Sequence, residues 1–210
     1  MYTGRIVAIA RNLEGRLAVL YRVSSRSFPN REAQMKTAAV SIVPKKGFEG
    51  DVFKNPYIAY NCLRIAGATA VATNGSQTDP IAEKIAAGTP ARDAFVSILQ
   101  ALDYEKDQLN TPRIAAAVVR GGDSGFLGVV REDGLEAQRM KVEKGECYFV
   151  STYETNHVSS ANRGEFDAST AQQGAEFILS KGIFADMTNA VTGVCAMEQK
   201  DGFEIAIAMA

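Results

Sequence analysis

Two segments of this chain are apolar at every position. Residues 114–119 read IAAAVV, and residues 206–210 read AIAMA. As strands, both segments place apolar side chains on both faces, and such a strand is stable only where other structure covers each face. We therefore expect sheets that stack on one another between helical layers.

The rest of the chain contains further strand-like and helix-like segments. Alternation of apolar and polar residues predicts strands, whereas apolar residues at helical spacing behind a proline predict helices. The predicted strands are residues 4–12, 16–26, 36–44, 113–120, 126–132, 135–142, 146–154, 190–198 and 203–210. The predicted helices are residues 56–70, 79–88, 90–102 and 170–181.

These segments form groups of strands that are separated by groups of helices. Such grouping is typical of α+β proteins with antiparallel sheets, whereas a regular strand-helix repeat would indicate a parallel sheet. The chain has 210 residues and no internal repeat or linker composition, so we expect a single domain over residues 1–210. The residues alone thus predict an α+β fold with two mostly antiparallel sheets between helices.

The charge balance argues against several classes of partner. The chain has 23 Lys and Arg against 24 Asp and Glu, which leaves no basic surplus for binding nucleic acid or an anionic membrane. Its three cysteines form no Cys-x-x-Cys pair, and the sequence contains no His-Glu-x-x-His, P-loop or Gly-x-Gly-x-x-Gly string. We expect a cytoplasmic protein that uses no metal and no dinucleotide cofactor.

The segment YRVSSRSFPNR, residues 21–31, concentrates arginine and serine. Residues of equal parity share a face of an extended strand, so Arg22, Ser24 and Arg26 should lie together where an apolar face ends. Arg31 follows in the loop beyond. Guanidinium and hydroxyl donors suit a phosphate or a carboxylate. An edge strand with solvated arginines explains the spacing at least as well.

Six further residues have types or local settings that suit a binding site: Tyr57, Tyr60, Asn61, Asn74, Gly75 and Glu105. The tyrosines open a predicted helix and face either a pocket or the core. The Asn-Gly loop offers amide and backbone donors, although an ordinary turn explains it equally. The carboxylate follows a helix end, where it is an acid or base if buried and a surface group otherwise. The only histidine, His157, lies in a predicted loop and receives no role.

Several strings of this sequence, taken together, resemble the archaeal-type IMP cyclohydrolases. They are MYTGRIVAIAR and EGRLAVLYRVSSRSFPNR near the start, NPYIAYNCLRI and TNGSQTDPI in the middle, and TPRIAAAV further on. The likeness extends over nearly the whole chain. Its most specific part is RVSSRSFPNR, because that string has no generic structural reason to recur.

The resemblance implies both a fold and a reaction. The implied fold is that of the Ntn-hydrolases, a four-layer αββα sandwich. The implied reaction is the last ring closure of purine synthesis, which converts 5-formamidoimidazole-4-carboxamide ribonucleotide to inosine monophosphate (IMP) and water. The resemblance also implies a small-molecule purine nucleotide as substrate and no cofactor, and we expect a homo-oligomer.

For that reaction, the resemblance sorts the candidate residues into roles. The catalytic candidates are Tyr57 as a donor to the formyl oxygen, Glu105 as a base on the carboxamide nitrogen, and Arg26. The substrate-binding candidates would supply donors to phosphate or carbonyl groups, or recognise the base and ribose. They are Arg22, Ser24, Arg31, Asn61, Asn74 and Gly75.

Two other functions stay open at this point. In Ntn-hydrolases that cleave amides, a Thr, Ser or Cys exposed at the mature N-terminus is the nucleophile, and Thr3 takes that part only after two residues are removed. The sequence starts Met1-Tyr2, which favours a cyclohydrolase. The other function is a purine-nucleotide-binding protein that keeps the arginine pocket and catalyses nothing.

Overall fold

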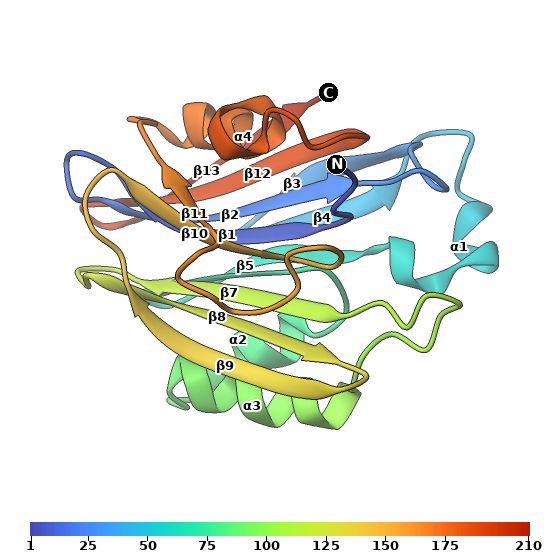
Figure 1. Ribbon diagram of the computed structural model, residues 1–210, viewed down its shortest axis with the longest axis horizontal. Coiled ribbons are helices and arrows are strands. Elements are labelled where there is room, and N and C mark those ends of the chain that lie inside the picture. Colours follow the sequence, from blue (N-terminus) through green and yellow to red (C-terminus); the bar gives the residue numbers. More distant parts are fainter.

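Two antiparallel sheets dominate the computed structural model, which describes residues 1–210 (Figure 1). The first sheet has six strands in the order β11-β10-β1-β2-β12-β13. Its strands are β1 (Ile6–Arg11), β2 (Leu17–Ser24), β10 (Glu146–Ser151), β11 (Arg163–Glu165), β12 (Ala190–Gln199) and β13 (Gly202–Met209). Strand β2 therefore pairs with β1 on one side and with β12, from the far end of the sequence, on the other.

The second sheet has seven strands, and each of them pairs with its neighbour in sequence, in the order β3 to β9. The strands are β3 (Arg31–Lys36), β4 (Ala39–Pro44), β5 (Tyr60–Ala66), β6 (Thr69–Thr73), β7 (Arg113–Val119), β8 (Ser124–Arg131) and β9 (Gly134–Lys141). This meander is inserted between β2 and β10 of the first sheet.

The helices cover the outer faces of the two sheets. Helix α4 (Ala171–Ser180) and the short η2 (Gly182–Phe184) pack on the first sheet, and α2 (Thr78–Ala86) and α3 (Ala91–Leu102) pack on the second (Figure 1). Two short turns, α1 (Asp51–Lys54) and η1 (Pro56–Ile58), connect β4 to β5. The layers follow the order αββα, which confirms the predicted α+β sandwich; its relation to the Ntn-hydrolases stays a prediction.

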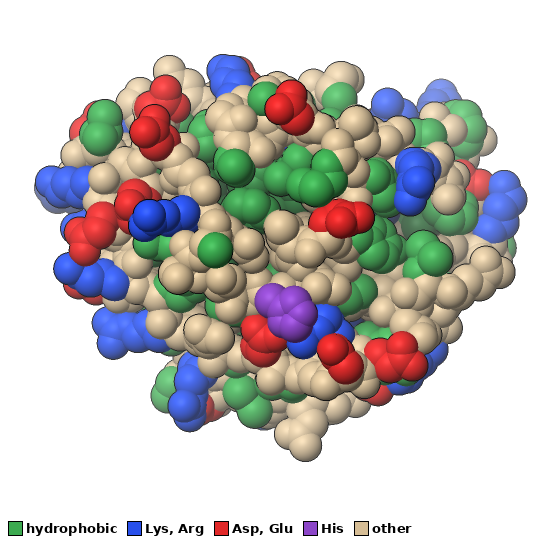
Figure 2. Space-filling view, viewed as in Figure 1, with side chains coloured by type: hydrophobic (Ala, Val, Ile, Leu, Met, Phe, Trp, Pro, Cys, Tyr) green, Lys and Arg blue, Asp and Glu red, His purple; other side chains and the backbone are tan.

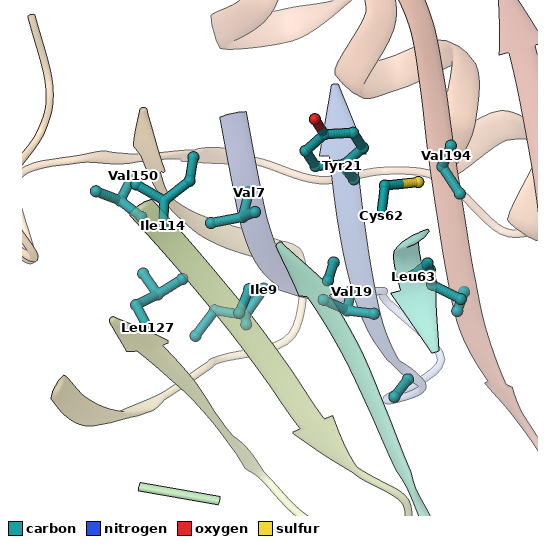
Figure 3. Close-up of a cluster of buried hydrophobic side chains, with 14 of the residues drawn as sticks. Val7, Ile9, Val19, Tyr21, Cys62, Leu63, Ile114, Leu127, Val150 and Val194 are labelled. Atoms are coloured by element: carbon teal, nitrogen blue, oxygen red, sulfur yellow. The ribbon is translucent and has the colours of Figure 1, made fainter. Parts of the chain in front are cut away.

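Three apolar cores hold these layers together. The largest lies between the sheets, where Val19 and Val194 of the first sheet face Leu63 and Ile114 of the second (Figure 3). A second core joins the first sheet to α4, and a third joins the second sheet to α2 and α3. Most strands are thus covered on both sides, as the continuous apolar run of β7 predicts.

The side chains of β2 alternate between the two faces of the first sheet. Val19 and Tyr21 point into the core between the sheets, whereas Leu20 belongs to the core under α4. Arg22 and Ser24 have the parity of Leu20, and both are fully buried. The predicted sharing of a face by Arg22 and Ser24 is therefore confirmed, but helix α4 covers that face.

The predicted helix over residues 56–70 is wrong. Only Pro56–Ile58 form a helical turn, and β5 and β6 follow as a hairpin around Gly67, whose φ is +60°. Both strands lie in the middle of the second sheet, where apolar residues are needed on each face. Their apolar pattern therefore lacks the alternation of a strand and imitates helical spacing.

The predicted strand over residues 36–44 also differs from the structure. It contains the end of β3, a turn at Ala38 with a φ of 55°, and β4. The polar sequence REAQMK of β3 carries no apolar stripe, since this strand is at an edge of the second sheet. The four strands β3, β5, β6 and β11 raise the number of strands above the nine expected.

The helices of the structure include none with the length and apolar composition of a membrane-spanning segment.

Candidate functional site

The carboxylate of Glu105 is buried in the loop that connects α3 to β7. Its side chain is only 1% exposed. The loop closes on itself, because the Glu105 N–H donates to the carbonyl of Thr111 at 2.8 Å. The preceding Asp103 has a φ of 56° and turns the chain inward after the helix. This local geometry brings a charged side chain into the end of the sandwich.

Two arginines face the Glu105 carboxylate. Arg5 Nη2 donates to Oε2 at 3.0 Å, and Arg113 Nη1 lies 3.7 Å from Oε1. The buried Oε1 accepts no hydrogen bond within the chain. Burial raises the pKa of Glu105 to about 7, although both arginines act to lower it. The carboxylate therefore combines a vacant acceptor with a proton affinity suited to a base near neutral pH.

Arg113, the first residue of β7, is fixed by its neighbours. Its Nε donates to the carbonyl of Asp103 at 2.9 Å, and its Nη1 donates to Gln77 Oε1 at 3.0 Å. Gly75 packs against this arrangement so closely that a Cβ there would lie 2.9 Å from Arg113 Nη1 and 3.2 Å from Glu105 Oε1. The Arg113 guanidinium carbon lies 5.7 Å from the ring centroid of Tyr57.

Two tyrosines meet between the sheets beside this cluster. The hydroxyls of Tyr21, on β2, and Tyr60, at the start of β5, lie 2.5 Å apart, with the rings nearly perpendicular at 83°. Burial raises the pKa of Tyr60, and the charges of Arg31 and Arg5 offset part of that rise. Arg31 is 3% exposed, and its Nε donates to the carbonyl of Phe28 at 3.0 Å.

A cleft of about 440 Å³ opens next to these groups. Its walls come from the loop before β3, from α1 and η1, and from the loop after Glu105. The lining residues are Ser27, Phe28, Lys54, Asn55, Pro56, Tyr57, Lys106, Asp107, Gln108 and Leu109. Tyr57 links the cleft to Arg113, and Phe28 links it to Arg31. A ligand in this cleft would have cationic and hydroxyl donors around it.

The structure brings together four of the residues predicted for the site. They are Tyr57, Glu105, Arg31 and Gly75. Glu105 is buried, so the interpretation of it as a surface carboxylate is wrong. Tyr60, whose position as a pocket or core residue was open, is half-buried and contacts Tyr21.

Three other predicted residues lie elsewhere. Arg22 is fully buried and donates to the carbonyls of Phe184 and Met187, and its Nε donates to Ser24 Oγ at 2.9 Å. These contacts are on the helical side of the first sheet, opposite the tyrosine pair. Arg26 is exposed, and its guanidinium stacks 4.0 Å from the ring centroid of Tyr2. The expected common site for these residues is corrected, because β2 ends at Ser24 and the parity ends with it.

The two asparagines have partners within the fold. Asn61 Nδ2 donates to both carboxylate oxygens of Asp79 on α2, at 2.9 and 3.1 Å. Asn74 is fully buried, and its side chain accepts from the Ile114 N–H and donates to the carbonyl of Pro112. Asn61 thus faces the helical layer, and Asn74 shapes the loop that positions Gly75. Neither residue lines the cleft, and their recognition of the base or ribose stays a prediction.

Arg5, Tyr21 and Arg113 are at the site but were not predicted from the sequence. Arg5 and Arg113 each stand directly before an apolar strand core, IVAIA and IAAAVV. An arginine directly before a strand that is apolar on both faces was the signal that could have identified both as site residues. Tyr21 carried no such signal, because an aromatic residue of inward parity is the ordinary core residue of a strand.

Thr3 and His157 do not join the site. Thr3 is fully buried, and its hydroxyl contacts the sulfur of Met187 at 3.6 Å, so it is not placed as an exposed nucleophile. His157 is on the surface, where its Nδ1 lies 2.9 Å from Glu136 Oε1 (Figure 2, purple). No group of three or more His, Cys, Asp or Glu side chains is arranged to hold a metal ion.

Comparisons with known proteins agree on one family. A family model described as IMP cyclohydrolase-like protein matches residues 2–202. An IMP cyclohydrolase of Methanosphaera stadtmanae is 45% identical over 205 residues, which cover 98% of each chain. An IMP cyclohydrolase of Methanocella arvoryzae is 49% identical over 174 residues, covering 82% of this chain and 83% of the relative. One of Methanocaldococcus jannaschii is 37% identical over 207 residues, 98% of each chain.

The family model covers almost all of the chain, and two of these relatives each cover 98% of it. The arginine-rich segment and the buried carboxylate described above lie within the matched residues. On this basis the chain belongs to the IMP cyclohydrolase-like family.

Proposed function

We propose that the Glu105 cluster is the active site of an IMP cyclohydrolase, in which the formylated imidazole carboxamide ribonucleotide closes to IMP and water. The observation that carries this proposal is the buried Glu105 carboxylate, whose Oε1 has no partner and whose pKa is raised to about 7. A nucleotide with amide hydrogens to lose offers that oxygen a donor. The family relationship supplies the identity of the nucleotide.

The reaction requires little bond chemistry from the protein. The carboxamide nitrogen and the formyl carbon are in one molecule, so much of the entropic cost of meeting is absent. The enzyme must bring the two groups into contact, stabilise the oxygen that becomes negative, and move protons. Each of these tasks has a candidate among the residues around the cleft.

The first step forms the bond between the carboxamide nitrogen and the formyl carbon. Glu105 accepts a proton from the attacking nitrogen, and Tyr60 donates a proton to the former formyl oxygen, which gives a neutral hydroxyl adduct. The guanidinium groups of Arg5 and Arg31 face the tyrosine oxygen and stabilise its negative charge.

The second step expels water. Protonated Glu105 returns its proton to the departing hydroxyl, and the Tyr60 phenolate takes the proton from the formamide nitrogen as the new double bond forms. One water leaves, and both side chains regain their starting states. The substrate phosphate occupies the cleft, where Lys54 and Lys106 provide cationic donors. In this scheme Tyr60 takes the donation to the formyl oxygen that the resemblance assigns to Tyr57, and Tyr57 borders the ring that closes.

The test is turnover of the formylated ribonucleotide by the purified protein, followed by absorbance of the product. We expect IMP formation by wild type and a loss of about 10²–10⁴ in kcat for Glu105→Gln, the usual contribution of a general base. The matched control is Glu143→Gln, since the Glu143 side chain is 59% exposed and pairs with Lys141 on the surface.

Two results would contradict the proposal. If Glu105→Gln turned over substrate as fast as Glu143→Gln, the carboxylate would not be the base. If wild type bound IMP without any turnover of the precursor, the chain would be a nucleotide-binding protein instead.

A further inference from the structure

The Tyr21 hydroxyl is a polar group in an otherwise apolar place. Tyr21 is fully buried among the valines, leucines and isoleucines of the core between the sheets (Figure 3). The contact with the Tyr60 hydroxyl at 2.5 Å is the only hydrogen bond that its oxygen makes. A phenylalanine would fill the same space without a polar atom to satisfy. The hydroxyl therefore needs an explanation other than packing.

Either oxygen could donate in this hydrogen bond, but the burial of the two side chains favours donation by Tyr21. The pair has two O–H protons, and only one of them lies between the two oxygens. Besides Tyr60, the titratable groups that face Tyr21 are Arg5, which carries donors and no acceptor, and the thiol of Cys62, with which Tyr21 makes no hydrogen bond. Tyr21 thus has one acceptor for its proton, the oxygen of Tyr60. With Tyr21 as the donor, the proton of Tyr60 is left for another acceptor, and the Tyr60 side chain is only partly buried.

We propose that Tyr21 is a positioning residue for the cyclohydrolase reaction, which donates to Tyr60 and thereby directs the Tyr60 proton at the substrate oxygen. This inference rests on the proposed function, because it assigns Tyr60 the donation to the formyl oxygen. Tyr21 itself touches no substrate. It keeps Tyr60 in one rotamer of its hydroxyl and then stabilises the phenolate with a charge-assisted hydrogen bond.

The pKa shifts of the two tyrosines agree with donation from Tyr21 to Tyr60. The titratable and charged groups that face Tyr60 are Tyr21 from β2, Arg31 from β3, Cys62 from β5 and Arg5 before β1. The hydrogen bond from Tyr21 lowers the pKa of Tyr60, whereas the bond raises the pKa of Tyr21. Of the two hydroxyls, Tyr60 is accordingly the one that gives up its proton first.

The test is a double-mutant cycle on kcat with Tyr21→Phe, Tyr60→Phe and the double variant. We expect Tyr21→Phe to lower kcat by about 10- to 100-fold, the range of a lost hydrogen bond to a charged group, with KM unchanged. In the Tyr60→Phe background, Tyr21→Phe should have no further effect. The matched control is Tyr148→Phe, another buried tyrosine of the same core, whose hydroxyl donates to Glu146 at 3.1 Å.

A second measurement separates positioning from a general loss of structure. Carbon NMR of protein labelled at tyrosine Cζ reports the pKa of Tyr60, which should rise in Tyr21→Phe because its phenolate loses a donor. Tyr148→Phe should leave that pKa unchanged. A pKa of Tyr60 that does not move in Tyr21→Phe would overturn the inference.

Failure of this inference can be told from failure of the proposed function. If wild type is active and Glu105→Gln is not, but Tyr21→Phe retains full kcat, only the role of Tyr21 is refuted. Equal losses from Tyr21→Phe in the wild-type and Tyr60→Phe backgrounds would refute it too. Should Tyr21→Phe not fold, Tyr60→Phe tests the same proton count. It leaves the Tyr21 proton without an acceptor and should lower the denaturant midpoint, and an unchanged midpoint would contradict the count.

Discussion

At the scale of single residues, the site depends on two opposing effects on one carboxylate. The cations Arg5 and Arg113 keep Glu105 from being an uncompensated buried charge, while burial keeps its proton affinity high. Neither effect alone yields a useful base, since a well-solvated carboxylate is too acidic and an isolated buried one does not ionise. The spacing of the two guanidinium groups around it is therefore a functional parameter.

Gly75 offers a direct way to disturb that spacing. A Cβ at Gly75 would meet Arg113 Nη1 at 2.9 Å and Gln77 Oε1 at 2.7 Å, so in Gly75→Ala the ends of these two side chains must shift. We expect kcat/KM for ring closure to fall by about tenfold or more, as displacements of about 1 Å cost in other active sites. The control is Gly202→Ala, because a Cβ there meets nothing within 4 Å. Equal activity of the two variants would show that the pair tolerates displacement.

Residue types and parity predicted only part of this site. Glu105, Arg31, Tyr57 and Gly75 were identified because each is a reactive or permissive residue outside a regular apolar pattern. Arg22 was predicted for the site from its residue type and its parity, yet it lies under α4. A sequence shows on which face of a strand a side chain lies, but not which layer of the fold covers that face.

At the scale of elements, Arg22 connects β2 to the segment after α4. Its guanidinium has no carboxylate partner. It donates instead to the carbonyls of Ile178, Phe184 and Met187. Ile178 lies in the last turn of α4, where the carbonyls lack partners within the helix and the helix dipole is negative. Burial lowers the pKa of Arg22 to about 10, so the group remains charged at neutral pH.

Removal of this connection should destabilise the fold. Arg22→Met leaves buried carbonyls without donors, and we expect the free energy of unfolding to fall by at least about 2 kcal/mol in denaturant titrations. Arg139→Met is the control, since that side chain is 67% exposed and should change stability by less than about 0.5 kcal/mol. A stable Arg22→Met protein with weakened nucleotide binding would instead restore the predicted phosphate role.

The elements themselves were predicted where the period was unambiguous. Strands β1, β8 and β9 and helix α4 match their patterns, because one face of each meets a core and the other meets water or a second core in regular order. The hairpin of β5 and β6 was predicted as a helix, because burial on both faces erases the alternation. The proposed ring-closing site needs β5 in that position, since Tyr60 is the first residue of this strand.

At the scale of the whole molecule, Glu105 links protonation to folding. Its pKa is raised from 4.5 to about 7 in the folded chain, so the folded state holds a proton that the unfolded state releases between these values. Stability contributed by this group is therefore present below about pH 4.5 and is lost as the pH rises towards 7.

As the pH rises from 4.5 to about 7, the free energy of unfolding of wild type should fall. That of Glu105→Gln should fall less, because glutamine does not titrate. Equilibrium denaturation at several pH values checks the difference, with Glu143→Gln as the control for a surface carboxylate. Parallel pH curves for wild type and Glu105→Gln would show that the pKa of Glu105 is the same in both states.

The position of β2 in the first sheet has a consequence for biosynthesis. One edge of β2 is completed only by β12, with Arg22 opposite Gly193 and Tyr21 opposite Val194. A ribosome makes β2 early and β12 late, so one edge of this apolar strand stays without its partner through most of translation. Until that late strand is made, Tyr21 lacks the neighbour Val194 that faces it across this edge. Under the proposed role of Tyr21, we therefore expect ring-closing activity only once this sheet is complete.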